Sequence, residues 1–445
     1  MTVRKVGAFA VALLSATVLL SQTWGAEFFV DSLANRGGTG SRSAAFTSIQ
    51  EGLNVLKPGD TLYVRGDTAG SGRIYSETPM FPVSGVKGSP ITVRSFPGEK
   101  VVVSTAEMII LDRDFLVIQG FIFDHQKAEI DAIRWSGNNI NLSECEVRNG
   151  SRDGIDVSGQ AKNVTISNCV IHDFVWADAA RRDAHCIVAN PGVIGVRITG
   201  NTIYNCSGDG IHLFANDSTP VSLYVTDAVV ENNTIYSTLG ANSENGIDFK
   251  GGVNVTVKQN DIHGFTHNKA VVVQKGARNL RLEGNMIHDS ARGVEFRWEA
   301  GNLQYNITVT RNVFFNITGQ YALKFDGVVN VKVIHNTFHN NAGNSIRVEQ
   351  KGIIGGIIKN NLIHLSGAPQ ILGRLAADYS HNGWFRSSGG FLSSSQDTVG
   401  TDPLFWNAPA KDFRLISTSP AIDRGTPVGI PYHGLAPDLG AFENM

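Results

Sequence analysis

Charged and polar residues between positions 185 and 297 are spaced in a way that could support chemistry, because one short motif recurs there. The motif reads Gly-Ile-x-apolar, as in residues 210–213 and 246–249. In an extended strand alternate side chains point to opposite faces, so residue x and its polar neighbours share one face. Acidic residues dominate the earlier copies of the motif, and basic residues dominate the copies after Lys269.

This strip of mixed charge is suited to an extended, charged polymer. An acidic cluster can hold a hard cation such as Ca²⁺ through oxygen ligands. Lys and Arg side chains pair with carboxylates, so they would bind an acidic polysaccharide built from uronates. The alternative is that these outward residues are solvated and form ion pairs with one another.

The strip favours cleavage of a uronate polymer by β-elimination, in which a base removes the C5 proton and O4 departs. Lys250 is the best candidate base, because it follows Glu244, Asn245 and Asp248 and precedes basic residues in the next two repeats. Neighbouring carboxylates keep an amine charged, so the assignment requires a metal that binds them, or a different base.

The other candidate catalytic residues are Lys275 and Arg297. The candidate substrate-binding residues are polar members of the same strip, and the two histidines among them could also act as acid or base. They are His185, His212, Lys269, Gln274, Arg292 and Glu295.

A repeat of about 25 residues, in which apolar positions alternate, predicts the fold. A marker position follows each alternating stretch and is Asn at 201, 233, 260, 285, 312, 336 and 361, with a weaker repeat near Arg386. Short strands that return to one marker in every turn indicate a solenoid, here an all-β, single-domain parallel β-helix of about ten turns. The amides of stacked Asn residues can bond to one another between turns.

Four segments are expected along the chain. Residues 1–26 are a signal peptide, with basic Arg4 and Lys5, an apolar stretch and small residues before the cleavage point. Residues 27–90 form an N-terminal cap that includes a short amphipathic helix over 48–56, stopped by Pro58-Gly59. Residues 91–386 are the β-helix, and residues 387–445 form a tail that packs on it. The mature protein is then a secreted or periplasmic monomer, and no later segment could span a membrane.

The four cysteines are expected to be structural. Cys145 and Cys169 occupy the marker position on adjacent turns, where they could form a disulfide or remain two buried thiols. Cys186 and Cys206 occupy non-equivalent positions and are predicted not to pair. No Cys-x-x-Cys spacing occurs, which argues against haem attachment and zinc ribbons.

Composition excludes other classes of protein. The 445 residues carry a net charge of −2, so the basic excess of a nucleic-acid binder is absent. With 42% hydrophobic and 18% charged residues, the chain can bury a large core and is not disordered.

Several motifs resemble secreted, right-handed β-helix polysaccharide lyases. The segment 58–64 (Pro-Gly-Asp-Thr-Leu-Tyr-Val) resembles the start of such enzymes. The stretch 245–251 (Asn-Gly-Ile-Asp-Phe-Lys-Gly), with 273–276 (Val-Gln-Lys-Gly), resembles the alginate lyase and chondroitinase B family, polysaccharide lyase family 6. Residues 243–248 also resemble the calcium site of family 9 pectate lyases.

The resemblance implies roles for individual residues. Lys250 matches the base, Gln274 stands where an Arg acts as acid, and Lys275 lies beside it. The implied Ca²⁺ ligands are Asp209, Glu244, Asn245 and Asp248.

Two other functions compete with a lyase. A C5-epimerase would share the proton abstraction, but the Asp-Pro-His motif of alginate epimerases is missing. A non-catalytic carbohydrate-binding solenoid would bind polymer without turnover. An inverting glycosidase of the polygalacturonase type is disfavoured, because its Gly-His-Gly and Arg-Ile-Lys motifs do not occur in this sequence.

Overall fold

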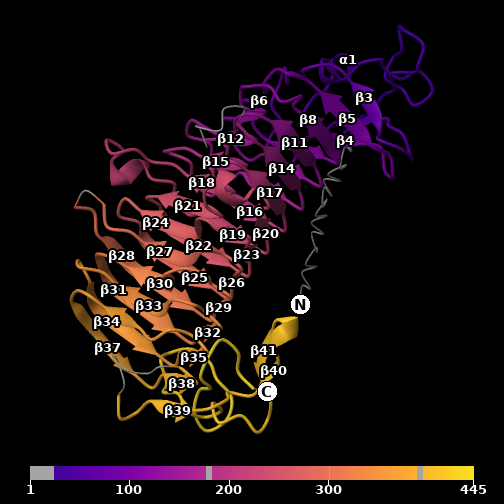
Figure 1. The fold of residues 1–445 in the computed structure, drawn as a ribbon. Helices are drawn as coiled ribbons and strands as arrows, with labels where there is room; N and C mark the ends of the chain where they lie inside the picture. The colour runs from indigo at the N-terminus through magenta and orange to yellow at the C-terminus, as the bar shows by residue number, and fades with distance from the viewer. Residues whose placement is uncertain (1–24, 177–182, 300, 388–393, 445) are drawn as a thin grey trace, which may run out of the picture.

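The chain coils into an all-β parallel β-solenoid of about 12 turns, which confirms the predicted fold class (Figure 1). The computed structural model describes residues 25–176, 183–299, 301–387 and 394–444. The predicted signal peptide lies almost entirely outside these residues. Within them, no helix is both long enough and apolar enough to cross a membrane.

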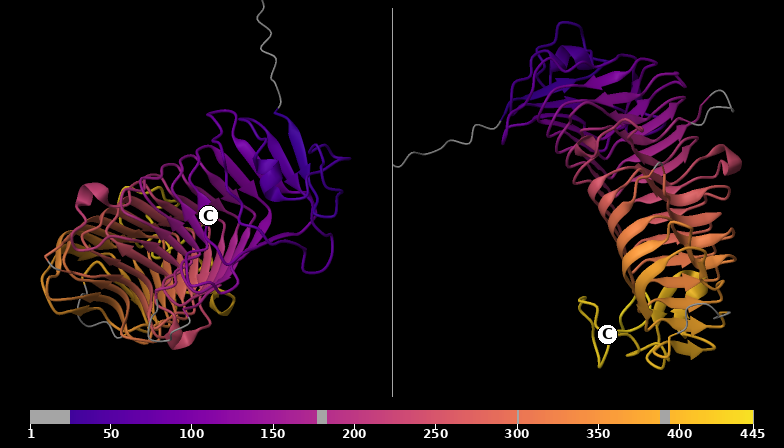
Figure 2. Two further views of the ribbon diagram at one scale, coloured as in Figure 1. Left: turned by 90° about the horizontal axis from the view of Figure 1, so that it is seen from above. Right: turned by 90° about the vertical axis from the view of Figure 1, so that its left-hand side faces the viewer.

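Each full turn contributes one strand to each of three parallel sheets, so neighbouring strands in a sheet come from consecutive turns (Figure 2). The first sheet comprises β1 (Glu27–Val30), β2 (Thr61–Val64), β4 (Ile91–Ser95), β7 (Leu116–Gln119), β10 (Asn141–Ser143), β13 (Thr165–Ser167), β16 (Arg197–Thr199), β19 (Val229–Glu231), β22 (Val253–Lys258), β25 (Arg278–Glu283), β28 (Gln304–Thr310), β31 (Val328–Ile334), β34 (Ile353–Lys359) and β37 (Leu375–Ser380).

The second sheet comprises β3 (Arg73–Tyr75), β5 (Val101–Ser104), β8 (Phe121–Asp124), β11 (Glu146–Gly150), β14 (Val170–Phe174), β17 (Thr202–Cys206), β20 (Thr234–Tyr236), β23 (Asp261–His263), β26 (Met286–His288), β29 (Val313–Phe315), β32 (Thr337–His339), β35 (Leu362–His364), β38 (Gly383–Phe385) and β39 (Thr398–Gly400). The third sheet comprises β6 (Ile109–Leu111), β9 (Ile133–Trp135), β12 (Ile155–Val157), β15 (Ile187–Ala189), β18 (Ile211–Leu213), β21 (Ile247–Lys250), β24 (Lys269–Gln274), β27 (Arg292–Phe296), β30 (Tyr321–Phe325), β33 (Asn344–Val348) and β36 (Gln370–Ile371).

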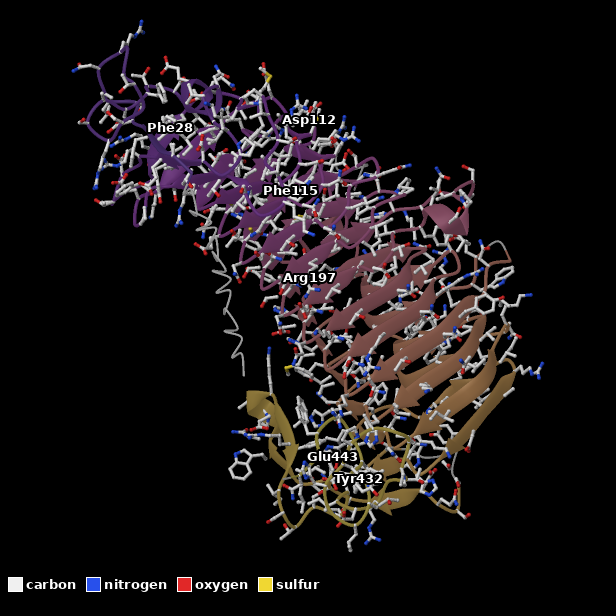
Figure 3. All side chains as sticks on the ribbon, turned by 180° about the vertical axis from the view of Figure 1, so that it is seen from behind. Phe28, Asp112, Phe115, Arg197, Tyr432 and Glu443 are labelled. Carbon is white, nitrogen blue, oxygen red and sulfur yellow. A yellow bond between two sulfur atoms is a disulfide. The ribbon has the colours of Figure 1, made fainter. Side chains whose placement is uncertain are left out.

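The N-terminal end of the rod is covered by α1 (Ile49–Leu53), whose Ser48 cap and Glu51 bond reciprocally, while Ile49 and Leu53 join the core. The antiparallel strands β40 (Phe405–Asn407) and β41 (Asp412–Leu415) pack along the side of the second sheet, where the ring centroids of Phe413 and Phe315 are 5.1 Å apart. Figure 3 shows Phe28 near the N-terminal end and Tyr432 and Glu443 near the other end.

The core is a continuous column of aliphatic and aromatic side chains inside the coil. The alternating residues predicted to point inward, such as Ile211, Leu213, Ile247 and Phe249, are all buried. Because each side chain stacks on its counterpart in the next turn, a substitution that changes side-chain volume would affect two neighbouring turns at once.

A ladder of buried asparagines joins the first sheet to the second, as the marker position predicts. The Nδ2 of Asn285 donates to Oδ1 of Asn312 at 2.8 Å and to the carbonyl of Val257 at 3.0 Å. Its Oδ1 accepts from the backbone N–H of Asn260 at 3.0 Å. The ladder ends at Asn382, which accepts from the backbone N–H of Asn361 at 3.0 Å, so the weaker repeat assigned near Arg386 was placed wrongly.

The structure contradicts the prediction for one pair of cysteines and decides between the two alternatives for the other pair. Cys145 and Cys169 are buried free thiols that continue the ladder, with the Cys169 N–H donating to Asn201 Oδ1 at 2.8 Å. Cys186 and Cys206 form a disulfide with their Cα atoms 5.7 Å apart, so the prediction that they do not pair was wrong. They occupy different repeat positions, but both lie at the corner between the second and third sheets, in adjacent turns.

Asn285→Ala should lower the free energy of unfolding by about 3 kcal/mol, because it leaves several buried backbone and amide groups without partners. Thermal and urea unfolding followed by circular dichroism would measure the change. Asn279→Ala is the matched control, since Asn279 belongs to an exposed ladder of amides and should cost about 1 kcal/mol. Equal losses of unfolding free energy in the two variants would show that the buried ladder stabilises the fold no more than the exposed one.

Candidate functional site

The outer face of the third sheet carries three columns of side chains around β15, β18, β21, β24 and β27, and each residue stands beside its counterparts in adjacent turns. The leading column holds His185, Asp209, Asn245, Lys269 and Arg292. The middle column holds Val188, His212, Asp248, Val272 and Glu295. The trailing column holds Asn190, Phe214, Lys250, Gln274 and Arg297.

Several side chains on this outer face are buried, although outward-pointing strand positions are usually exposed to solvent. Asp209 is 0% exposed, and His212 and Asp248 are each 3% exposed. The two longest steps between repeats, 32 residues each, separate Cys169, Asn201 and Asn233. The second of these steps contains β18 and, after it, the 3₁₀ helix Val221–Leu223. The sequence predicted the polar face but not its burial.

Asp209 is the best-bonded carboxylate on this face. Its Oδ1 accepts from the backbone N–H and the Nδ2 of Asn245, at 3.0 and 2.9 Å. Its Oδ2 lies 2.9 Å from Nδ1 of His212. Burial raises the pKa of Asp209, but these hydrogen bonds outweigh it and hold the pKa below its usual value. Asp209 is therefore a carboxylate at neutral pH.

His185 and His212 behave differently although their rings are only 4.5 Å apart. Nδ1 of His185 accepts the backbone N–H of Asp209 at 2.7 Å, and burial lowers the pKa of His185 to about 3, so this ring is neutral. Burial also lowers the pKa of His212, but the hydrogen bond to Asp209 outweighs burial and raises it above the usual value. Nε2 of His212 is buried without a hydrogen-bond partner among the described residues.

Asp248 connects His212 to the trailing column. Nε2 of Gln274 lies 2.9 and 3.0 Å from the two oxygens of Asp248, and Nζ of Lys250 lies 3.9 Å from Oδ2. Burial, and then the charge of Asp209, raise the pKa of Asp248 to about 6. Glu244 lies one residue before the leading column, and burial, then the charges of Asp209 and Asp183, raise its pKa to about 7.

Lys250 is the partly exposed cation at the centre of the group, with 29% of its side chain accessible. Its Nζ lies 5.9 Å from the centre of the Phe214 ring. Phe214 was missed in the sequence, because it lies one position beyond the recurring motif. The signal that could have revealed it is the register, which places it directly beside Lys250 in the preceding turn.

The predicted basic residues fall into two sets. Lys275 follows β24 with a left-handed φ of 58° and forms ion pairs with Asp217 and Glu299, so it is engaged outside the three columns. Arg292 and Arg297, in contrast, have no ion-pair partner in the described ranges and remain available to a ligand.

Glu295 is held by its own ion-pair cluster. Nζ of Lys324 and the hydroxyl of Tyr321 each lie 2.9 Å from it, and Nζ of Lys269 lies 3.7 Å away. Burial raises the pKa of Glu295, but these cations outweigh burial and keep the pKa below its usual value. Lys269 and Glu295 therefore form an ion pair with each other.

Two groups of His and Asp side chains lie close enough together to hold a metal ion. In each group the possible ligand atoms lie within 4.8 Å of one another. The first group is His185, Asp209 and His212, and the second is Asp261, His263 and His288 on the second sheet. In the second group, Nε2 of His288 lies 2.7 Å from Asp261 and 3.2 Å from Nζ of Lys411, so a cation already occupies that position.

Comparison with known proteins supports the fold. Residues 185–363 match the family described as "Right handed beta helix region". No curated protein sequence matches the chain. The disulfide agrees with a location outside the cytoplasm.

Three solved structures illustrate the likeness. XylC in complex with xylose is 13% identical, with a TM-score of 0.52, covering 85% of this chain and 87% of that one. PfbA, a surface adhesin of Streptococcus pneumoniae, is 12% identical, with a TM-score of 0.51, covering 82% and 98%. Pectate lyase Pel9A is 16% identical, with a TM-score of 0.47, covering 94% and 96%.

At these identities the likeness shows the fold alone. The fold is shared with polysaccharide lyases, an alginate epimerase, an adhesin and a tailspike protein. Several of the similar structures are polysaccharide lyases, and an adhesin also matches.

The raised pKa values of Asp248 and Glu244 predict a contribution to stability that falls as pH rises. The folded protein binds protons at these groups that the unfolded chain has already lost, so their contribution to the free energy of unfolding decreases as pH rises from about 4 to 7. Asp248→Asn should flatten this decrease by up to about 3 kcal/mol. Urea unfolding at several pH values measures it, and exposed Asp112→Asn is the control. An unchanged pH slope in Asp248→Asn would contradict the assignment.

Proposed function

We propose that this protein is a secreted or periplasmic polysaccharide lyase that cleaves a uronate-containing polysaccharide by β-elimination, with Lys250 as the base. The observation that carries the proposal is the setting of Lys250: a partly exposed amine on a largely buried polar face, beside an aromatic ring and two carboxyl groups of raised pKa. Because burial raises the pKa of Glu244 to about 7, this carboxyl group is partly protonated near neutral pH and holds less negative charge against the amine.

The surrounding residues suit the binding of a uronate. Phe214 offers an apolar ring beside Lys250 on which a sugar can rest. Arg297 and Arg292 lie in the turns that follow Lys250 and can pair with substrate carboxylates, which makes the C5 proton more acidic. In the reaction Lys250 in its neutral form takes the C5 proton, the electron pair forms the C4–C5 double bond, and the C4–O4 bond breaks.

The four residues implied as Ca²⁺ ligands do not fit a preformed calcium site. Both oxygens of Asp209 accept hydrogen bonds from Asn245 and His212, and both oxygens of Asp248 lie within 3.0 Å of Gln274 Nε2. Among the four, Glu244 alone has a carboxylate without a hydrogen bond in the described structure. Since Ca²⁺ takes six to eight oxygen ligands, we derive no step through a metal.

Lys250→Ala should lower the rate of unsaturated-product formation at least about 100-fold, because it removes the general base. Ultraviolet absorbance of the new double bond measures this rate on mannuronan, guluronan, polygalacturonate, glucuronan and glycosaminoglycans. Gel retardation should show that polymer binding persists. Lys332→Ala, an exposed lysine on the first sheet, is the control and should retain full activity.

Undiminished turnover in Lys250→Ala would remove the base assignment. If the unaltered protein produced no unsaturated ends from any polymer, the lyase itself would be rejected. A C5-epimerase or a non-catalytic binding solenoid would then be the better interpretation.

Exhaustive dialysis against EDTA should change the turnover of the unaltered protein by less than about twofold, because the oxygens of Asp209 and Asp248 already accept hydrogen bonds and too few remain free for Ca²⁺. The measurement compares dialysed protein with and without added Ca²⁺. Loss of activity that Ca²⁺ restores would show that the hydrogen-bonded arrangement rearranges around a metal.

A further inference from the structure

A groove of about 860 Å³ runs along the corner between the second and third sheets, beside β29, β32 and β35 (Figure 1). Amides, hydroxyl groups, one arginine and an exposed leucine line it. Its volume lies within the range of ligand-binding clefts, and a mixture of apolar and convergent polar groups is typical of them. The proposed function assigns this groove no role.

Five residues in consecutive turns occupy one position along the groove. The register of the second sheet aligns them, because the residue before each one lies beside its counterpart in the next turn. They are Asp289, Asn316, Asn340, Leu365 and Arg386, and all have a left-handed backbone with φ between 45° and 54°. At about 4.8 Å per turn, this groove column is about 19 Å long, which is long enough for several sugar residues.

The first three members of the groove column suit this conformation. Asp and Asn adopt a left-handed backbone more readily than other residues that carry a side chain. Their side chains also form a ladder, in which Nδ2 of Asn316 donates to Oδ1 of Asp289 at 3.1 Å and Nδ2 of Asn340 donates to Oδ1 of Asn316 at 2.8 Å. The ladder stops there, because Leu365 has no amide to donate to Asn340.

Leu365 and Arg386 are not residues that the fold itself favours at these positions. A left-handed backbone is unfavourable for both, since it brings Cβ close to the following carbonyl oxygen. Leu365 also leaves 42% of its surface exposed. Arg386 is exposed, and in the described parts of the chain only its backbone N–H is bonded, to the carbonyl of Gly400 at 3.2 Å. Residues that oppose local stability and face a groove indicate a functional role.

Another exposed ladder shows what the same rod uses away from the groove. Its last amide is Asn330, whose Nδ2 donates to Oδ1 of Asn306 at 2.8 Å. The next position in the register is Gly355, with φ of 80°. Glycine adopts this conformation without a steric penalty. The groove column therefore departs from the solution that the rod uses elsewhere.

We propose that this groove is a second polysaccharide-binding site, which holds a stretch of an acidic polysaccharide away from Lys250. The guanidinium of Arg386 pairs with a uronate carboxylate. Oδ1 of Asn340 accepts a hydrogen bond from a sugar hydroxyl, and Leu365 contacts the apolar C–H face of a ring. The class of ligand rests on the proposed function, whereas the groove and its column do not.

The position of the groove favours long chains. The turn of Asp289 is also the turn of Arg292, two turns after Lys250. A long polymer that passes Lys250 can therefore reach the groove as well, whereas a short oligosaccharide cannot occupy both. Two linked contacts on one chain raise the apparent affinity above that of either contact alone.

The test measures binding by isothermal titration calorimetry in the Lys250→Ala variant, so that no polymer is cleaved. The probes are polygalacturonate, mannuronan, guluronan, glucuronan and chondroitin sulfate. For the polymer that binds most tightly, Arg386→Ala should weaken binding at least about fivefold. The long chain should bind at least about tenfold more tightly than its own trisaccharide, and Arg386→Ala should reduce this ratio at least about fivefold.

Leu365→Asn separates binding from stability. It should raise the midpoint of thermal unfolding, because it extends the amide ladder and suits the left-handed backbone, yet it should weaken polymer binding at least about threefold. Asn340→Ala should also weaken binding at least about threefold. Asn330→Ala is its matched control, because it ends the other ladder, and Lys332→Ala removes a positive charge from the first sheet. Both controls should bind within about 1.5-fold of the parent variant.

A polymer whose carboxylates have been reduced to primary alcohols tests the role of charge. Arg386→Ala should weaken binding of this neutral polymer by less than about twofold, because the ion pair is already lost. An equal loss on the acidic and the neutral polymer would overturn the assignment of a carboxylate to Arg386.

Affinities of Arg386→Ala and Leu365→Asn within about 1.5-fold of the controls would overturn the groove as a binding site, and so would the absence of binding to every probe. Formation of unsaturated ends by the unaltered protein would still support the lyase in that case. Conversely, a protein that binds through the groove but forms no unsaturated ends would keep this second site and lose the lyase.

Discussion

The hydrogen-bonded register between consecutive turns is the constraint on which the rest of the structure depends. Parallel pairing and the buried asparagine ladder fix every turn relative to the next, so that position x of one strand always lies beside position x of its neighbours. The register decides which side chains form the core, and it also decides which polar groups are brought together outside. The candidate site is therefore a by-product of the same repeat that builds the rod.

The regular stacking of turns places acidic side chains close to one another. Asp209 and Asp248 stand in consecutive turns near Glu244, and both are buried. The structure resolves this crowding in two ways. Hydrogen bonds keep the pKa of Asp209 below its usual value, whereas burial and the charge of Asp209 raise the pKa of Asp248 to about 6 and that of Glu244 to about 7. One fold thus gives similar carboxyl groups different charges, which is the usual basis of acid and base roles within one site.

The sequence predicts those features that repeat. Alternation of apolar residues reveals the strands, and the recurring Asn marks one corner of every turn, so the solenoid and its ladder follow from pattern alone. The short helix α1 also follows from local signals, an amphipathic stretch that Pro58-Gly59 ends.

Features that depend on one particular turn are not predictable in this way. The disulfide of Cys186 and Cys206 joins different repeat positions, and only the corner geometry brings them together. Lys275 directly follows Gln274 in the sequence, but its own backbone is left-handed and it forms an ion pair with Asp217. His212 is buried beside His185, Phe214 and Asp209, and the alternation of apolar residues gives no sign of this.

The disulfide has a mechanical consequence. A solenoid can unravel turn by turn from a free end, since each turn touches only its two neighbours. The bond between Cys186 and Cys206 closes a covalent loop across two consecutive turns, directly beside His185 and Asp209. Under tension, unravelling that starts at either end would be arrested at this link. The part of the rod best protected from being pulled apart is therefore the part that carries the imidazole and carboxylate cluster.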